Sequence, residues 1–341
     1  MHSKIFFYSV LLITGLLFAQ VSLAQKGAKY HVLNTFHVSG PGGWDYISVN
    51  PSTGNIYVAH STVVSIISPD GVQVGEIPNT TGVHGIAFAP EFGKGFTSNG
   101  KLNTVTIFGI KSNKVFAEIP VGEKPDAIMY DPYSKNVFVC NGHSKDLTVI
   151  DPFAGNVLHT IPLGGKPETA VSDERGRIYV NIEDKDEIAV VNAKTFEVEA
   201  RWPLHGGKSP TGLAIDKSTH RLFAGCDNKV LIVMNADSGK VVAKVPIGDG
   251  CDGVAFDPKE KRVFSANGQD GTLTVIKEVS ANKYEVEENA VTKKGARTIT
   301  LDERSHLIYL PTAEFDMSKQ TKEQKRPDIV QGTFQILVVG K

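Results

Sequence analysis

Residues 124–165 read KPDAIMYDPYSKNVFVCNGHSKDLTVIDPFAGNVLHTIPLGG, and this stretch decides the fold. Four short apolar runs, at 127–130, 137–140, 147–150 and 157–163, are separated by DPYSK, NGHSK and DPFAG. Such clusters of Asp, Pro, Asn, Gly and Ser favour tight turns, and no helical spacing of apolar residues runs through the stretch. The pattern predicts a four-stranded unit, which cannot bury both faces of its own sheet and so needs copies of itself on either side.

The chain supplies these copies. Aligning on the first strand gives seven matches: DYISVNP (45–51), HGIAFAP (84–90), DAIMYDP (126–132), ETAVSDE (168–174), TGLAIDK (211–217), DGVAFDP (252–258) and RTITLDE (297–303). Second strands follow as NIYVAH, KGFTSN, NVFVCN, RIYVNI, RLFAGC, RVFSAN and LIYLPT. A four-stranded repeat with a period near 40 residues is typical of a β-propeller.

A proline marks the fourth strand of five units, at Pro78, Pro120, Pro162, Pro203 and Pro246, spaced by 42, 42, 41 and 43 residues. Proline has no N–H for a sheet ladder and is confined to edge strands. The fourth strand is therefore expected to be the outer edge of each unit.

The two ends of the chain are expected to close the ring together. The seventh unit has three strands and then the chain ends, whereas NTFHVSG (34–40) has no unit of its own and matches HTIPLGG (159–165) in pattern. The sequence thus predicts an all-β, seven-bladed β-propeller over residues 25–341, with the last blade closed by the N-terminal strand.

The repeats NIYVAH, NVFVCN, RIYVNI and RVFSAN, followed by T-V-x-I strands and I-P-x-G edges, resemble the YVTN-repeat β-propeller family, including YncE-like periplasmic proteins. The resemblance covers essentially all of 30–341. It implies an extracytoplasmic propeller; some family members bind nucleic acid or surface components, and relatives include lactonases and quinoprotein subunits. The fold hosts many activities, so the resemblance does not fix a function.

Residues 1–24 have the pattern of a secretory signal peptide: Lys4, a short apolar run over 5–18, and Ser-Leu-Ala before Gln25. The apolar run is shorter than the ~20 residues of a membrane helix, which argues against a transmembrane anchor. We therefore expect a periplasmic or secreted protein with no transmembrane segment after signal cleavage. The formal net charge of -1 and the lack of a basic stripe argue against nucleic acid as a partner.

The first strand of a propeller blade lines the central channel, so the first-strand starts should meet at its mouth. They form a ring of polar residues: Asp45, His84, Asp126, Glu168, Thr211, Asp252 and Arg297. Two interpretations are open: polar groups wetted by channel water, or a ligand site with convergent polar groups. Crowded carboxylates have raised pKa values, which suits acid–base chemistry with His84 or Glu168 as base and Arg297 as the charge-stabilising group. Alternatively, Arg297 only neutralises Asp252 or Asp45.

The second-strand ends, among them His60, Asn99, Asn141 and Asn267, are expected at the same face. We include His60 and Asn141 with the ring as candidate ligand-binding residues, although Asn at this repeat position is also suited to hydrogen bonding the following turn. A divalent metal is a further interpretation, with His60, His84, Asp126 and Glu168 as candidate ligands, but no metal-binding motif supports it.

Three cysteines allow at most one disulfide. Cys226 and Cys251 end and begin strands at the same face of neighbouring blades, so they form the candidate pair. Cys140 alternates with Phe138 and is expected to be buried.

Two further features surround the predicted mouth. Lys124, Lys166, Lys208 and Lys294 precede first strands and would form either a solvated rim or an attractor for anions. Residues 313–331 form a long charged insertion over the channel face, either a disordered loop or a lid, with Glu314, Phe315 and Arg326 near its ends.

The sequence supports two functional hypotheses. The first is a binding or scaffold protein that takes a small molecule or an extracytoplasmic macromolecule at the channel mouth. The second is a lactonase-like hydrolase or a lyase that uses the His/carboxylate/Arg ring, with or without a metal.

Overall fold

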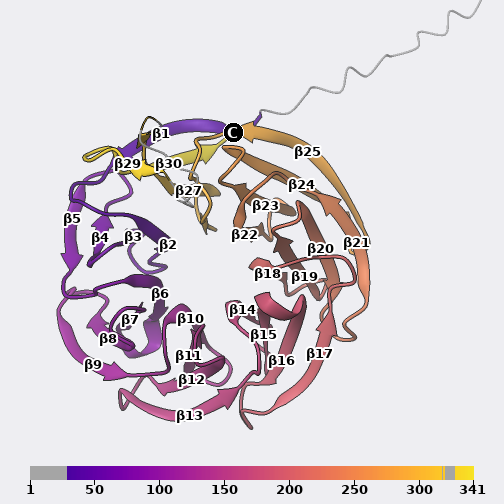
Figure 1. The fold of residues 1–341 in the computed structure, drawn as a ribbon, viewed down its shortest axis with the longest axis horizontal. Helices are drawn as coiled ribbons and strands as arrows, with labels where there is room; N and C mark the ends of the chain where they lie inside the picture. The colour runs from indigo at the N-terminus through magenta and orange to yellow at the C-terminus, as the bar shows by residue number, and fades with distance from the viewer. Residues whose placement is uncertain (1–28, 317, 319–326) are drawn as a thin grey trace, which may run out of the picture.

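A computed structural model describes residues 29–316, 318 and 327–341. The predicted signal peptide at 1–24 and Arg326 lie outside the described residues. Seven four-stranded antiparallel sheets form a ring around a central axis, which confirms the predicted seven-bladed β-propeller (Figure 1). No helix among the described residues is long and apolar enough to cross a membrane.

Each blade runs outward from an inner strand at the axis. Blades 1 to 3 are β2(Trp44–Val49), β3(Ile56–His60), β4(Val63–Ile67) and β5(Gln73–Ile77); β6(Val83–Ala89), β7(Lys94–Asn99), β8(Thr104–Gly109) and β9(Val115–Pro120); and β10(Pro125–Asp131), β11(Asn136–Asn141), β12(Asp146–Asp151) and β13(Asn156–Pro162). Blades 4 to 6 are β14(Pro167–Ser172), β15(Arg177–Ile182), β16(Glu187–Asn192) and β17(Val198–Pro203); β18(Pro210–Asp216), β19(Arg221–Cys226), β20(Val230–Asn235) and β21(Val241–Pro246); and β22(Cys251–Asp257), β23(Arg262–Asn267), β24(Thr272–Ser280) and β25(Lys283–Val291).

Blade 7 contains β26(Thr300–Asp302), β27(Leu307–Thr312), β30(Gln335–Gly340) and, as its outer strand, β1(His31–His37). β1 pairs antiparallel with β30, with Thr35 opposite Leu337 and Phe36 opposite Ile336. The N-terminal strand therefore closes the ring as predicted, and the C-terminus lies beside β1 (Figure 1).

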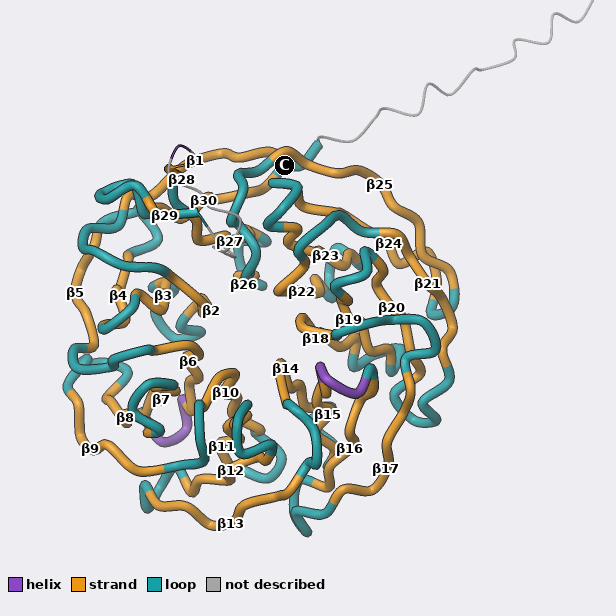
Figure 2. Tube along the Cα trace, in the orientation of Figure 1, coloured by secondary structure: helices purple, strands orange, loops and turns teal. Residues whose placement is uncertain are grey.

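The connections add little regular structure. The turns between strands and the short 3-10 helices η1(Pro90–Phe92) and η2(Glu183–Lys185) connect the strands of the blades (Figure 2). The insertion after β27 carries a two-stranded sheet of β28(Phe315–Asp316) and β29(Asp328–Ile329).

The blades pack face to face through the apolar side chains of their middle strands, which are almost entirely buried. At the seam between blades 1 and 7, the Trp44 and Phe334 rings stack at 5.7 Å and 15°. Phe36 from the closing strand is buried in the same cluster. The closing strand is thus held by apolar burial as well as by its ladder.

Side-chain hydroxyls join neighbouring blades to one another close to their inner strands. Ser48 Oγ donates to the Ile86 carbonyl (2.9 Å), Thr298 Oγ1 to the Asp45 carbonyl (2.7 Å), and Ser98 Oγ to the Asp126 carbonyl. Gly85 permits this close approach, because a Cβ there would lie 2.9 Å from the Asp126 carbonyl oxygen. The backbones that carry the ring of polar residues are therefore fixed across blade boundaries.

Candidate functional site

The first-strand residues lie where the sequence predicts, at the inner end of each blade. Six of them occupy the second position of their inner strands, whereas Arg297 lies in the loop before β26. The structure brings Asp45, His84, Asp126, Asp252 and Arg297 into one network.

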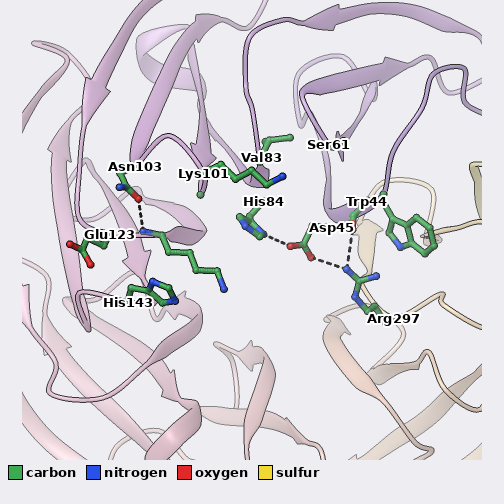
Figure 3. A pocket seen from close by; sticks show the side chains of 14 residues that line it. Trp44, Asp45, Ser61, Val83, His84, Lys101, Asn103, Glu123, His143 and Arg297 are labelled. Atoms are coloured by element: carbon green, nitrogen blue, oxygen red, sulfur yellow. Dashed lines mark hydrogen bonds and ion pairs between the residues drawn. The ribbon is translucent and has the colours of Figure 1, made fainter. Parts of the chain in front are cut away.

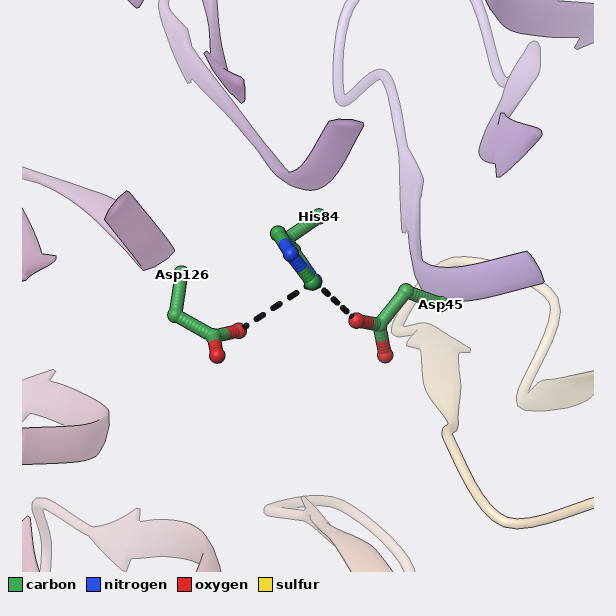
Figure 4. Close-up of side chains that lie close together, drawn as sticks. All are labelled: Asp45, His84 and Asp126. Atoms are coloured by element: carbon green, nitrogen blue, oxygen red, sulfur yellow. Dashed lines mark hydrogen bonds and ion pairs between the residues drawn. The ribbon is translucent and has the colours of Figure 1, made fainter. Parts of the chain in front are cut away.

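The centre of the network is a three-residue cluster contributed by blades 1, 2 and 3. His84 Nδ1 lies 2.5 Å from Asp45 Oδ2 and 3.7 Å from Asp126 Oδ1, so the imidazole sits between two carboxylates (Figure 4). The side chains of His84, Asp45 and Asp126 are 24%, 19% and 14% exposed, so solvent screens their interaction only in part.

Arg297 extends this cluster toward blades 6 and 7. Its Nε donates to Asp252 Oδ2 (2.8 Å), and one Nη donates to the Trp44 carbonyl (2.9 Å) and lies 3.5 Å from Asp45 Oδ1. Its guanidinium also lies 5.6 Å from the Trp44 ring. Arg297 thus contacts both Asp252 and Asp45, the pairing that one interpretation of the sequence expects. Asp45 is in turn held between Arg297 and His84 (Figure 3).

The electrostatics of the cluster favour protonation. Burial alone would lower the pKa of His84, but the hydrogen bond with Asp45 and the charge of Asp126 outweigh it, so the pKa of His84 is raised. Burial, reinforced by the charge of Asp45, raises the pKa of Asp126 to about 6. The surroundings therefore favour the protonated forms of His84 and Asp126.

Glu168 lies in blade 4 and belongs to a separate pairing. Lys166 Nζ donates to Glu168 Oε1 (2.5 Å) and also to Glu183. Burial and the charge of Asp126 raise the pKa of Glu168 to about 9 against the opposing effect of Lys166. Burial, as the largest of these effects, therefore favours the protonated form of Glu168.

Two cavities open on the mouth, one on each side of Trp44 and Arg297. The first, of about 530 Å³, is lined by residues of blades 1 to 3 and Arg297, including Asp45, His84, Lys101, Lys124 and His143 (Figure 3). The second, of about 620 Å³, is lined by blades 4 to 7 and includes Asp252, Thr211, Lys294 and Phe315. Volumes of this size are typical of small-molecule sites.

The structure does not place His60 and Asn141 at the mouth, so this part of the prediction is wrong. His60 is 1% exposed and lies 4.4 Å, centroid to centroid, from the Phe334 ring; its Nδ1 is 3.2 Å from Ser65 Oγ. Asn141 is fully buried and donates to Asp146 and Thr148 of β12. The reason is that these second-strand ends point into the packed space between blades and not into the channel. His60 consequently cannot join a metal site with His84.

The repeat asparagines have a local structural role, but their side chains bond to the third strand and not to the turn that precedes it. Asn99 donates to Thr104 and Thr106, Asn141 to Asp146 and Thr148, and Asn267 to Thr272 and Thr274.

The predicted disulfide is a second correction, since Cys226 and Cys251 are free and buried, as is Cys140. Cys226 Sγ donates toward the Ala224 carbonyl, and Cys251 Sγ accepts from Ser265 Oγ at 3.2 Å. Burial raises the pKa of the Cys226 thiol to about 12 and that of Cys251 to about 11. Thiols held in the neutral form by burial behave as small apolar groups.

The described ends of the insertion reach the mouth. Phe315 and Ile329 line the second cavity, and the Phe315 and Trp44 rings lie 5.9 Å apart. Glu314 instead pairs with Lys293 at 2.5 Å, on the rim.

Tyr46, on the inner strand β2, is a residue next to the ring that the sequence prediction missed. Its hydroxyl lies 3.5 Å from Thr169 Oγ1, so the side chain reaches from blade 1 to blade 4. Burial and the neighbouring carboxylates hold the pKa of Tyr46 well above its usual range. The alignment carried a signal: the residue after each first-strand start is Tyr46, Gly85, Ala127, Thr169, Gly212, Gly253 and Thr298. Only one of these is large.

The cluster can perform two kinds of chemistry. Asp45 Oδ2, His84 Nδ1 and an oxygen of Asp126 lie within 4.8 Å of one another, a donor set of imidazole and carboxylate that suits divalent transition metals. The same His84–Asp45 hydrogen bond orients an imidazole as a general acid or base. Glu168 takes part in neither the metal-binding set nor the His84–Asp45 pair, because its side chain contacts Lys166.

No family model matches the sequence, and no curated protein is similar to it. Among solved structures, a chain of the Kuenenia stuttgartiensis hydrazine synthase is similar, with a TM-score of 0.71 and 15% sequence identity over 80% of this chain and 94% of that chain. At this identity the similarity shows the β-propeller fold and carries no information on activity.

Proposed function

We propose that this protein is an extracytoplasmic β-propeller of the YVTN type that binds a ligand at the mouth of its central channel. The observation that carries the proposal is the meeting of Asp45, His84 and Asp126, from three separate blades, beside a cavity of about 530 Å³. Half-buried polar groups that converge in a concave site are typical of ligand recognition. The repeat motifs NIYVAH and RVFSAN support the family, and residues 1–24 support a periplasmic or secreted location.

The test begins with a thermal-shift screen of the secreted protein against small polar organic molecules and chloride salts of Zn²⁺, Mn²⁺ and Ca²⁺. We expect His84→Ala and Asp126→Asn to weaken binding of a hit by about tenfold or more, the effect of losing about 1.4 kcal/mol. His159→Ala, on the exposed outer strand β13, is the matched control and should bind normally. Unchanged binding in both mouth variants would refute a site at the mouth.

A second candidate is a lactonase-like hydrolase or a lyase, favoured by the 2.5 Å hydrogen bond between His84 Nδ1 and Asp45 Oδ2. Asp45, itself held by Arg297, would orient the imidazole, and His84 would move the proton, with or without a divalent cation. Because the pKa of His84 is raised, a base mechanism predicts activity that rises with pH through that value. In a turnover assay on aliphatic lactones, His84→Ala should lower the rate by about 100-fold or more at unchanged thermal stability. Equal rates for wild type and variant would exclude His84 as the base.

A further inference from the structure

The first cavity has an uneven distribution of charge along its wall. Lys101 and Lys124 line one part, and Asp45 and His84 line the part nearest the axis. Glu123 also lines the cavity, but its carboxylate points away from His84 (Figure 3). Arg297 is occupied by Asp252 and Asp45. The ammonium groups of the two lysines are therefore the cations available to a bound molecule.

Comparison between neighbouring blades explains why Lys124 is available. Lys166 has the same repeat position in KPE as Lys124 has in KPD. Lys166 is neutralised by Glu183 and also donates to Glu168, and Lys208 of the next blade is neutralised by Asp186 at 2.6 Å. In blade 3 the position equivalent to Glu183 is Gly142, and Asp126 is turned toward His84. Within the described residues, Lys124 is thus left without an ion-pair partner.

Lys101 is held at the same cavity by its aliphatic part. A Cβ on Gly82 would lie 2.6 Å from Lys101 Cγ, so the lysine stem packs directly against this glycine. In Figure 3 the side chain extends toward the side of the cavity where His84 lies. Like Lys124, it has no ion-pair partner in the described part of the chain. Two such ammonium groups in one concave site attract an anion.

Asp45 supplies the opposite character at the inner end, where its side chain lines the same cavity. Its Oδ2 lies 2.5 Å from His84 Nδ1 and its Oδ1 lies 3.5 Å from Arg297, and each carboxylate oxygen can accept a further hydrogen bond. A molecule that fills the cavity would therefore meet ammonium groups at its outer end and hydrogen-bond acceptors at its inner end.

We propose that the first cavity selects a small organic anion, whose carboxylate or phosphate contacts Lys101 and Lys124 and whose hydroxyl or amino group donates to Asp45. This inference rests on the proposed binding function and names its ligand class. Lysine ammonium groups accept carboxylate and phosphate alike as point charges, so the two anionic groups are distinguished by experiment.

The experiment is calorimetric titration of the purified protein at low ionic strength with four probes. Gluconate and glycerol phosphate carry an anionic group and hydroxyls, glucose carries hydroxyls only, and hexanoate carries the anion only. We expect one or both of the first two to bind more tightly than glucose and hexanoate, and binding to weaken with added salt. A preference for gluconate assigns a carboxylate and a preference for glycerol phosphate assigns a phosphate.

Variants separate this inference from the proposed function. The double variant Lys101→Gln/Lys124→Gln should weaken binding about tenfold or more, whereas Lys111→Gln, in the turn at the other end of blade 2, should leave it unchanged. The inference is overturned if neither anion binds at about 10 mM, where even a millimolar site is mostly filled. It is also overturned if binding is lost in His84→Ala but retained in the lysine variant; that result would leave the mouth as the binding site and remove the selection for anions.

Discussion

At the scale of single residues, three groups at the mouth have higher pKa values in the folded protein than in the unfolded chain. Burial raises the pKa of Glu168 to about 9 and that of Asp126 to about 6, and the pKa of His84 is also raised. Through these three groups, the folded protein binds more protons than the unfolded chain between about pH 4 and pH 9, so their contribution to the free energy of unfolding falls as pH rises through this range.

Glu168→Gln tests this at one position, because glutamine retains an oxygen for Lys166 and cannot ionise. At about pH 4, the wild-type carboxyl and the variant amide are both mostly neutral, in the folded and in the unfolded state. At pH 8 the wild-type carboxyl keeps its proton only in the folded state, which costs stability. Urea unfolding should therefore show the variant gaining about 1 kcal/mol or more over wild type between these pH values.

Glu197→Gln, exposed in the turn between β16 and β17 of the same blade, is the matched control and should follow wild type at both pH values. Parallel pH profiles for wild type and Glu168→Gln would show that Glu168 ionises normally, with Lys166 as a full counter-ion.

Gly100 fixes the position of the His84 ring. A Cβ at Gly100 would lie 2.6 Å from both Cδ2 and Nε2 of His84, whereas a Cβ at Gly142, the equivalent residue of blade 3, would have no atom nearer than 3.6 Å. Gly100→Ala should therefore displace the imidazole from Asp45, and the pKa of His84 should fall. Gly142→Ala should leave it unchanged. An NMR titration of the histidine ring measures both, and an unaltered His84 in Gly100→Ala would show that the neighbouring turn yields instead.

At the scale of elements, the closing strand β1 is secured by one buried aromatic. Phe36 is 6% exposed and packs with Tyr309 between blades 7 and 1, whereas Leu33 on the same strand is 45% exposed. Phe36→Ala should lower the free energy of unfolding by about 3 kcal/mol, as expected for a buried aromatic, and Leu33→Ala should change it far less. Equal effects in denaturant unfolding would mean that the ladder with β30 and not the apolar contact holds the strand.

The inner strands were predictable from the sequence because turn residues and alternating apolar runs repeat seven times. The proline-marked outer strands and the N-terminal closure followed from the same pattern. The direction of side chains at strand ends was less predictable. The start of the first strand, Asp45, and the end of the second strand, His60, were both predicted to lie at the mouth. The His60 side chain instead packs between blades 1 and 7, against Phe334. Contacts between blades decide this, and no single repeat contains them.

The ion pairs at the mouth could likewise not be predicted from the sequence. Lys124 and Lys166 occupy identical repeat positions, but Lys166 pairs with Glu183 from the turn after its own second strand, whereas Lys124 has no ion pair among the described residues. Tyr46 shows the opposite case, since its size stands out in the alignment although its reach to Thr169 does not. The repeat thus decides which residues lie in the ring of polar groups. The contacts that each of them makes depend on residues that differ between the repeats.

At the scale of the whole molecule, the ring is closed by splitting one blade between the two ends of the chain. His31 pairs with Gly340, and Lys341 Nζ lies 5.1 Å from the Tyr30 ring centroid, so the ends of β1 and β30 are close enough to be joined by a tight turn. Circular permutants can therefore place new ends either between two blades or within one, while keeping every strand in its place.

A permutant opened between Gly40 and Pro41 makes blade 7 continuous and leaves only side-chain packing between blades 7 and 1. A permutant opened between Asp237 and Ser238, in the exposed turn before β21, splits blade 5 as the natural chain splits blade 7. We expect both to fold, since both openings lie in exposed loops. The first should be less stable by about 2 kcal/mol, the low end of what a covalent constraint contributes, and the second should unfold near wild type. If both unfold at the same denaturant concentration, interblade contacts such as the Trp44–Phe334 stack close the ring without help from the shared blade.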